Sequence, residues 1–285
     1  MAQDLRGLPV AKELTNKVAA RAQALRDAGV VPTLAIVRVG ARADDLAYER
    51  GACKRCESAG IDVRVFELSQ DCTQEELLNT IAQINANDEL HGCLLFRPLP
   101  VSLDEEAACA AIDPAKDVDC ATADSLYGVF ACCDTGFPPC TAEACVELLD
   151  YYDVPLQGAK VTVIGRSLVI GKPVSMMLQA RNATVTMCHT RTRNLDEECK
   201  GADVLVVAAG RAGVVGSDAV REGQVVVDVG INWDEVNQRL CGDVAYDEVE
   251  PIVGALTPVP GGVGSVTTAV LAKHVVRAAE KRYAE

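Results

Sequence analysis

An alternation of apolar runs with helical segments is the feature that most restricts the fold of this chain of 285 residues. A helical stretch over residues 11–28 precedes the apolar run 33–39, which is typical of a buried strand. The alternation continues with a helix at 44–59, a strand at 63–68, a helix at 73–87 and a strand at 92–96. Helices placed between strands let the strands run parallel, so the order predicts an α/β fold with a mainly parallel sheet.

A second series of strands and helices follows a turn-rich stretch at residues 136–140. It begins with a helix at 141–152 and has strands at 160–164, 184–188, 204–208 and 225–229. We therefore place a domain change near residue 140. A last helix, near 266–284, is expected to return to the first domain. The prediction is two domains, one of residues 1–140 plus 266–285 and one of residues 141–265.

Composition and charge exclude several classes of function. Hydrophobic residues make up 49% of the chain, which is enough for two cores, while the net charge of −14 repels nucleic acid and anionic lipid. No apolar stretch has the length of a membrane helix, and the opening residues carry charges where a signal peptide would be apolar. We expect a soluble, cytoplasmic protein without nucleic-acid or membrane partners.

Thirteen cysteines are scattered between Cys53 and Cys241. An odd number in a long chain indicates reduced thiols rather than a disulfide framework. The pair Cys53 and Cys56 has CxxC spacing, but it falls inside a predicted helix and has no second pair at zinc spacing. No metal site is therefore predicted.

A glycine-rich loop follows the strand at 160–164 and leads into a helix. Gly165 lets the chain turn sharply, Gly171 allows close approach to a pyrophosphate, and Pro173 suits the first helical position. The spacing is not GxGxxG, and an ordinary turn between strand and helix remains an alternative on spacing alone.

The end of the next strand favours one nucleotide over another. In NAD-binding folds this strand usually ends in a carboxylate that holds the ribose, whereas here it ends in Cys188-His189-Thr190-Arg191-Thr192-Arg193. Hydroxyls and guanidiniums suit a 2′-phosphate, and Arg166 could add a bidentate contact. The predicted cofactor is NADP.

Eight short motifs occur in an order that is similar to one known family, and they extend over nearly the whole chain. They are Tyr48, Pro98-Leu99-Pro100, Lys116-Asp117-Val118-Asp119, Pro139-Cys140-Thr141, Gly165-Arg166-Ser167, Asp228-Val229-Gly230-Ile231-Asn232, Gly242-Asp243-Val244 and the stretch from Thr257 to Gly264. In this combination the chain resembles the bifunctional methylenetetrahydrofolate dehydrogenase/cyclohydrolase family, FolD, as a divergent member.

The resemblance implies an N-terminal α/β substrate domain and a Rossmann-like NADP domain with a cleft between them, in a homodimer formed through the nucleotide domains. It implies a folate substrate, possibly polyglutamylated, in one-carbon metabolism. Asp119 would pair with the pterin edge and Tyr48 would stack on the folate. The resemblance assigns the remaining substrate contacts to Pro98, Leu99, Pro260, Gly261 and Gly262, and the dinucleotide contacts to Gly165, Arg166, Ser167, Thr190 and Ile231.

The sequence departs from the family at the reacting centre. The family has an essential lysine four residues after the tyrosine, where this chain has Ala52; Lys54 lies about 200° further around the helix. The family's glutamine at the end of the fourth strand is Phe96, and the leucine after it is Arg97. The glycine that usually follows the pterin carboxylate is Cys120.

Chemistry decides which activity these changes affect. Hydride transfer to nicotinamide depends chiefly on positioning, whereas hydrolysis of the methenyl product needs water activation and a proton transfer. We therefore expect oxidation of methylenetetrahydrofolate to persist, with hydrolysis weakened or carried by a relocated base such as Lys54 or Arg97. The catalytic candidates are Tyr48, Lys54 and Asp119. Alternatives are a monofunctional dehydrogenase and a non-catalytic regulator that binds NADP or folate.

Overall fold

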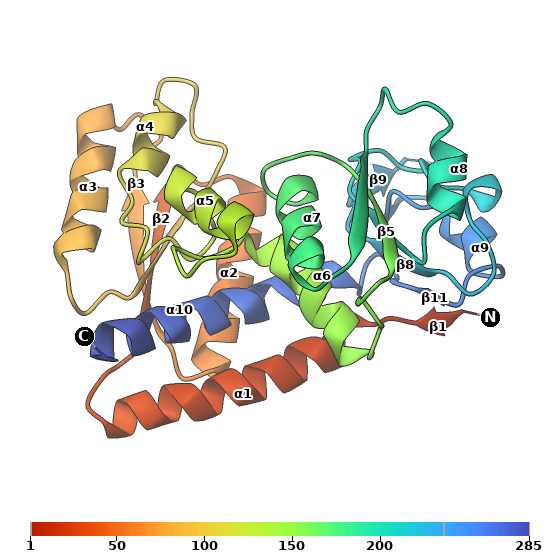
Figure 1. The fold of residues 1–285 in the computed structure, drawn as a ribbon. Helices are drawn as coiled ribbons and strands as arrows, with labels where there is room; N and C mark the ends of the chain where they lie inside the picture. Colours follow the sequence, from red (N-terminus) through yellow and green to blue (C-terminus); the bar gives the residue numbers. More distant parts are fainter. Residues whose placement is uncertain (1, 236, 285) are drawn as a thin grey trace. The chain divides into compact units, whose positions relative to one another are not determined.

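The computed structural model describes residues 2–235 and 237–284 and divides by contacts into two compact units. One consists of Lys12–Cys140 with Thr268–Glu285 and is called here the three-strand unit; the other consists of Met1–Ala11 with Thr141–Thr267 and is called the six-strand unit. Each contains a parallel sheet with helices (Figure 1). The predicted α/β class with two domains and mainly parallel strands is confirmed.

The sheet of the three-strand unit has β2 (Thr33–Val39) at its centre, between β3 (Asp62–Leu68) and β4 (Gly92–Leu95). Both neighbours run parallel to β2, and all seven residues of β2 are buried. A strand buried on both faces reads as a continuous apolar run, which explains its sequence. The helices of this unit are most of α1 (Gly7–Asp27), α2 (Ala43–Ser58), α3 (Gln74–Ala86), α4 (Glu105–Ala110), α5 (Ala123–Ala131) and α10 (Thr267–Ala284). Helix α6 (Cys140–Tyr151) begins at the end of this unit and otherwise belongs to the six-strand unit.

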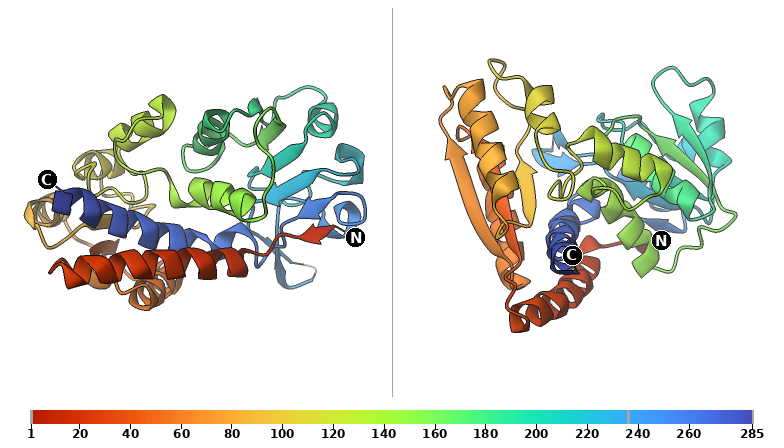
Figure 2. Two further views of the ribbon diagram at one scale, coloured as in Figure 1. Left: turned by 60° about the horizontal axis from the view of Figure 1, so that its bottom comes forward. Right: turned by 60° about the vertical axis from the view of Figure 1, so that its left-hand side comes forward.

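Local signals in the sequence account for the ends and faces of these helices. The side chain of Thr73 accepts from the backbone of Glu76, whose side chain accepts from the backbone of Thr73, so α3 begins with the predicted capping box. Leu77, Ile81 and Ile84 lie on one face of α3 and join a buried core with residues of β2 and β4. Helices α1 and α10 run side by side in the views of Figures 1 and 2, joined by an ion pair between Arg21 and Glu280.

The sheet of the six-strand unit has the order β1-β11-β8-β7-β5-β6, with every pair parallel. The strands are β1 (Gln3–Asp4), β5 (Lys160–Ile164), β6 (Thr184–Cys188), β7 (Val204–Val207), β8 (Val225–Asp228) and β11 (Ala255–Leu256). The chain passes from β6 back across β5 to β7, so the direction of winding reverses between β5 and β7. Ligands of open parallel sheets bind at the carboxyl ends of the strands at such a reversal.

Shorter elements complete this unit. Helices α7 (Gly171–Ala180), α8 (Leu195–Lys200) and α9 (Tyr246–Val249) accompany the sheet, and β9 (Asn232–Asp234) pairs with β10 (Arg239–Cys241) in an antiparallel hairpin. Two single turns of 3₁₀ helix lie at 217–219 and 263–265.

The division into units differs from the sequence-based one at the N-terminus. Residues 1–11 group with the six-strand unit, because Gln3 and Asp4 pair with Ala255 and Leu256 of β11. Helix α1 consequently begins at Gly7 rather than near residue 11, and it starts in one unit and continues in the other. The substrate and cofactor assigned to each domain, and the cleft expected between them, stay predictions.

Candidate active site

The loop after β5 turns sharply at Gly165, which has φ +135°, a backbone conformation that favours glycine. A side chain at Gly165 would lie 2.3 Å from the carbonyl oxygen of Ala208, the residue that follows β7. The loops after β5 and β7 therefore touch at the reversal point of the sheet. Gly171 is needed for a similar reason, since a Cβ there would lie 2.2 Å from the carbonyl oxygen of Gly165.

Between these two glycines the loop is held by its own hydrogen bonds. The hydroxyl of Ser167 accepts from the backbone N–H of Ile170, and the carbonyl of Ser167 accepts from the backbone of Lys172. Helix α7 begins at Gly171, which makes Pro173 the third helical residue rather than the first. Proline fits there too, because the first N–H groups of a helix have no partner within it. The loop thus presents a helix N-terminus, a suitable place for a phosphate group.

Exposed guanidiniums gather where β5 and β6 end. The two strands are paired in register up to Ile164 and Cys188, so the loops that follow leave from the same edge. Arg166 follows β5, whereas Thr190, Arg191 and Arg193 follow β6, and all four are exposed. Within the described parts of the chain, none of the three arginine side chains has an ion pair or a hydrogen bond. They are available to an anionic group, and the edge lacks the carboxylate that would hold a free ribose.

Ile231 and the glycine-rich loop before α10 line one hollow of about 260 Å³ in the six-strand unit. This hollow brings together a predicted cofactor residue, Ile231, and three predicted substrate residues, Pro260, Gly261 and Gly262. The carbonyl of Gly261 accepts a hydrogen bond of 2.8 Å from the backbone N–H of Gly7, so the start of α1 fixes this loop.

Two buried carboxylates brace the strand ends beside this hollow. Asp228 accepts from the backbone of Gly230, Asp243 and Val244, at 2.9 to 3.0 Å. Asp243 in turn accepts from the backbone N–H groups that follow β7 and from the side chain of Asn232. Burial raises the pKa of Asp228 to about 6, against the lowering effect of its backbone donors. We had not predicted this brace, although both acids stand in the motifs that suggested the family.

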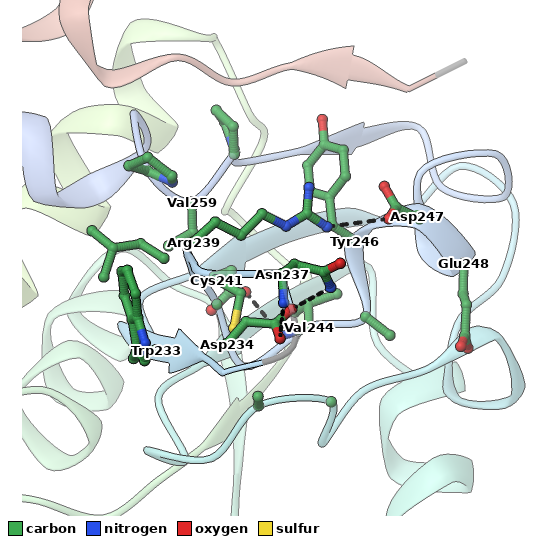
Figure 3. A pocket seen from close by; sticks show the side chains of 18 of the residues that line it. Trp233, Asp234, Asn237, Arg239, Cys241, Val244, Tyr246, Asp247, Glu248 and Val259 are labelled. Atoms are coloured by element: carbon green, nitrogen blue, oxygen red, sulfur yellow. Dashed lines mark hydrogen bonds and ion pairs between the residues drawn. The ribbon is translucent and has the colours of Figure 1, made fainter.

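A larger hollow of about 880 Å³ lies along the β9–β10 hairpin (Figure 3). Trp233 and Arg239 line it, Asn237 bonds to Asp234 at its floor, and Arg239 approaches Asp247 at 3.6 Å. Of the predicted site residues it includes only Pro260. The sequence contained no signal for it, because three-residue strands are too short to show a period.

In the three-strand unit, Tyr48 of α2 packs edge-on against Phe96, which follows β4, with ring centroids 5.8 Å apart. The tyrosine is 36% exposed overall, yet desolvation of its hydroxyl raises the pKa of Tyr48 well above its usual range, and the neighbouring Cys140 and Asp119 act in the same direction. The hydroxyl therefore stays protonated and can donate. Asp119 is close enough for its charge to act on Tyr48, and the folate contacts that the resemblance assigns to these two residues stay predictions.

The face of α2 beyond Tyr48 carries no lysine. Ala52 is fully buried one turn later, whereas Lys54 is exposed. Arg55, which shares the face of Tyr48 and Ala52, donates to the hydroxyls of Thr15 and Thr268. The centre next to the tyrosine is thus formed by an aromatic ring and a methyl group rather than by a hydrogen-bonded lysine and glutamine.

The segment after Phe96 is held from two sides. The Arg97–Pro98 peptide bond is cis, and Arg42 donates to the carbonyl of Pro98. The backbone N–H of Leu99 donates to Glu105 at 2.8 Å. Pro98 is exposed and Leu99 is buried, so Pro98 is the more accessible of these two predicted substrate residues.

The two aspartates of the Asp117-Val118-Asp119 motif have different surroundings. Asp117 is 1% exposed and accepts four hydrogen bonds from Ala121, Thr122 and Ser125, which fix the loop into α5. Asp119 accepts one backbone hydrogen bond, of 2.9 Å, from Cys140 at the start of α6. Asp119 keeps acceptor capacity for a ligand, whereas Asp117 does not.

In the part of the chain that the structure describes, no three histidine, cysteine or acidic side chains are grouped to hold a metal ion. All thirteen cysteines are free thiols. Across residues 2–235 and 237–284, no helix combines the length and apolar character that crossing a membrane would require.

Comparison with known families matches both halves of the chain. Residues 5–119 match the tetrahydrofolate dehydrogenase/cyclohydrolase catalytic domain, and residues 139–283 match the NAD(P)-binding domain of the same family. A protein of Carboxydothermus hydrogenoformans named bifunctional protein FolD is 53% identical over 281 residues, which cover 98% of each chain.

Solved structures agree with these matches. The crystal structure of the bifunctional enzyme FolD from Campylobacter jejuni has a TM-score of 0.95 at 35% identity, covering 99% of this chain and 100% of that one. The Trypanosoma brucei methylenetetrahydrofolate dehydrogenase-cyclohydrolase, complexed with NADP and an inhibitor, has a TM-score of 0.92 at 32% identity and covers 100% and 99%.

Proposed function

Because the chain belongs to the tetrahydrofolate dehydrogenase/cyclohydrolase family, we propose that it oxidises 5,10-methylenetetrahydrofolate to 5,10-methenyltetrahydrofolate with NADP and hydrolyses the product to 10-formyltetrahydrofolate. The observation that carries the proposal is the coexistence of an open pterin carboxylate, Asp119, with a nucleotide loop flanked by exposed, unpaired guanidiniums. The proposed folate substrate would be recognised by Asp119, and NADP would be recognised by the nucleotide loop with its neighbouring guanidiniums.

NADP is held in this proposal by the edge of the six-strand sheet. The loop of Gly165, Arg166 and Ser167 receives the phosphates at the start of α7, and Thr190 with the neighbouring guanidiniums receives the 2′-phosphate. Ile231 packs against the nicotinamide end, beside the loop that contains Gly261. Bound NADP supplies the hydride acceptor; the side chains only orient the reacting groups.

Folate is held in this proposal chiefly by Asp119, which accepts from the ring N–H and the amino group of the pterin. Tyr48 stacks on the folate and donates its hydroxyl toward the reacting end. Pro98 and Leu99 are the further folate contacts proposed in the three-strand unit, and Pro260, Gly261 and Gly262 are those proposed in the six-strand unit, where proline and glycine leave room for a flat ring. A polyglutamate tail would extend from the same ligand.

Hydrolysis is the slower of the two activities in this proposal. Ala52 and Phe96 provide neither a proton acceptor nor a donor next to Tyr48. Of the two relocated bases considered, the guanidinium of Arg97 offers only hydrogen-bond donors, so Lys54 is the one that could accept a proton. Lys54 is exposed, and reaching the centre would require its side chain to leave that position.

One assay on one preparation tests the proposal. Purified protein is given methylenetetrahydrofolate with NADP or NAD, and NADPH formation and methenyltetrahydrofolate decay are followed separately. We expect rapid NADPH formation that is weaker with NAD, and slow but measurable hydrolysis. Formation of NADPH without any hydrolysis would indicate a monofunctional dehydrogenase, and absence of NADPH would indicate a regulator.

Two variants locate the hydrolytic base. Hydrolysis in Lys54→Ala that falls about 10-fold or more, with oxidation unchanged, supports the relocated lysine. Hydrolysis that is unaffected in both Lys54→Ala and Arg97→Ala removes the idea of a relocated base.

We also propose that the protein is a homodimer formed through its nucleotide domains and that it works in the reducing cytoplasm. The support for the dimer is the hairpin β9–β10, which exposes Trp233 and Leu240 beside the hollow of Figure 3. The support for the compartment is the set of free thiols. Light scattering of wild type and Trp233→Glu tests the dimer, which the charged variant should dissociate.

A further inference from the structure

Two side-chain donors converge on one carbonyl oxygen next to Asp119. The oxygen belongs to Val118, whose carbonyl carbon forms the peptide bond to Asp119. Nδ1 of His274 in α10 lies 2.8 Å from this oxygen, and the thiol of Cys140 donates to it at 3.3 Å. A carbonyl oxygen only accepts, so Nδ1 of His274 carries a proton and donates. All four residues belong to the three-strand unit.

Packing fixes the ring of His274. The residue is fully buried, and its ring lies against that of Phe137 with centroids 5.1 Å apart. Phe137 is itself buried beneath Arg277 and Lys281, whose charged groups lie 5.7 and 5.3 Å from its ring centre. His274, Arg277 and Lys281 share one face of α10. Because the imidazole is already ordered, its hydrogen bond to Val118 costs little further side-chain entropy.

These donors reach Asp119 by two short routes. The peptide group is planar, so fixing the carbonyl of Val118 also fixes the plane that contains the backbone nitrogen and Cα of Asp119. The backbone N–H of Cys140 donates to Oδ1 of Asp119 at 2.9 Å. Cys140 therefore holds the peptide before Asp119 with its thiol and the carboxylate with its backbone. Its sulfur lies 3.7 Å from Nδ1 of His274, so the two donors form one cluster.

The direction of the carboxylate matters for the ligand in the proposed function. The pterin edge presents two N–H donors, which Asp119 accepts together only when both of its oxygens face them. Hydrogen bonds weaken steeply when their angle departs from linearity. Asp119 lies in a turn, and the next residue, Cys120, has a φ of 57°. A strand therefore does not fix the direction of this side chain, and the donors around Val118 can do so.

Resting on the proposed folate activity, we propose that His274 and Cys140 are positioning residues that aim the carboxylate of Asp119 at the donor edge of the pterin. They act through the peptide between Val118 and Asp119 and take no part in hydride transfer. Cys140 belongs to a motif that suggested the family. His274 stands in none of these motifs and lies 156 residues from Val118 along the chain, so only the fold brings it to this carbonyl.

Two substitutions of His274 separate its donor from its volume. His274→Phe keeps a ring of similar size without the donor, whereas His274→Asn keeps a donor near the place of Nδ1 in a smaller side chain. In His274→Phe we expect the KM for methylenetetrahydrofolate to rise about tenfold with kcat within about threefold, because a misdirected carboxylate weakens binding of substrate and transition state alike. His274→Asn should recover most of this rise. If His274 only filled space, the smaller asparagine would be the more damaging change.

Substitutions of Cys140 test the second donor. We expect the folate KM to rise about fivefold in Cys140→Ala and to stay within about twofold in Cys140→Ser, which keeps a hydroxyl donor. The double variant of His274→Phe and Cys140→Ala should exceed the product of the single effects, because Val118 then loses both donors. Cys140→Ala also tests the same carbonyl if His274→Phe does not fold.

His91→Phe is the matched control. His91 is another buried histidine of the three-strand unit, but its Nδ1 accepts from the backbone N–H of Thr33. It should leave the folate KM unchanged, and chemical unfolding of each variant separates lost stability from altered binding. An unchanged folate KM in His274→Phe would overturn the proposal, as would an asparagine variant no better than the phenylalanine one. Failure of the proposed function is separate, because wild type itself would then form no NADPH.

Discussion

Two regions differ in how their residues are constrained. One is the nucleotide edge, which here means the carboxyl ends of the six-strand sheet with the loops that follow them, where NADP is proposed to bind; the other is the end of β4 in the three-strand unit. At the nucleotide edge, Asp228 and Asp243 each bond to several backbone groups, so one substitution would disturb several loops. At the end of β4, the side chain of Phe96 contacts the ring of Tyr48 edge-on. We infer that a residue bonded to several backbone groups is hard to replace, whereas a contact between two side chains, such as Tyr48 and Phe96, can be replaced by changing one or both of them.

Asp119, the proposed partner of the pterin, should be the most sensitive position of the candidate site. Replacing Asp119 by asparagine sets an amide N–H₂ against the donors of the pterin and removes charge-assisted hydrogen bonds, at a cost of about 3 kcal/mol. We expect kcat/KM for methylenetetrahydrofolate to fall about 100-fold in steady-state assays, with the Kd for NADP unchanged by calorimetry. Asp124→Asn, an exposed carboxylate of α5, is the control. A fall of less than about threefold would contradict the assigned role.

The guanidiniums at the nucleotide edge should be the next most sensitive. Arg166→Ala combined with Arg191→Ala removes two exposed cations whose side chains have no ion pair or hydrogen bond among the residues that the structure describes. We expect the KM for NADP to rise about 30-fold and the KM for NAD to change less than about twofold, because only NADP carries the 2′-phosphate. Arg181→Ala, whose partner is Asp150, is the control. An equal change for both nucleotides would mean that these arginines do not select NADP.

Introducing the family's lysine at residue 52 of α2 and its glutamine at residue 96, after β4, should produce a smaller effect, a gain in the rate of hydrolysis. Ala52→Lys with Phe96→Gln replaces the aromatic contact to Tyr48 by a lysine and its hydrogen-bond partner. We expect hydrolysis of methenyltetrahydrofolate to rise about tenfold, with oxidation within about threefold. A double-mutant cycle on the hydrolysis rate measures whether the residues act together. Purely additive effects would show that their exchange is not coupled.

The buried brace should appear as a dependence of stability on pH. The pKa of Asp228 rises from about 3.9 in the unfolded chain to about 6 in the folded one, so the folded state binds the extra proton between these values. This contribution to stability is present below about pH 4 and is lost as pH rises through about 6, by at most about 1.4 kcal/mol per pH unit.

Chemical unfolding of wild type and Asp228→Asn at several pH values measures this contribution. The variant lacks the titration, so the stability difference between the two proteins should move against wild type as pH rises from 4 to 6. A constant difference across that range would show that Asp228 keeps an ordinary pKa.

The sequence predicted the elements that are long or strongly patterned. The runs at 33–39 and 160–164 are strands with the predicted bounds, because buried parallel strands are continuously apolar. Strands β1 and β11 have two residues each, and their pairing joins Gln3 to Ala255, which no local pattern encodes. The hairpin β9–β10 and the helices α4 and α9 were not predicted, because elements this short show no hydrophobic period.

The turn of the glycine-rich loop could be predicted from the sequence, because Gly165 has the positive φ that favours glycine. The contact of Arg166 with a 2′-phosphate stays a prediction. The distinction between Asp117 and Asp119 could not be read from their spacing, since it depends on which side chains of a later loop bond to each.

The edge strand β1 has a consequence for how the protein matures. Gln3 and Asp4 pair with residues near position 255, so the six-strand sheet is completed only after most of the chain has left the ribosome. Pairing over such a separation carries a large loop-closure entropy and is expected to form late in folding. Gln3 and Asp4 are synthesised long before residue 255, yet they would be among the last residues to pair, and a chaperone would meet them unpaired.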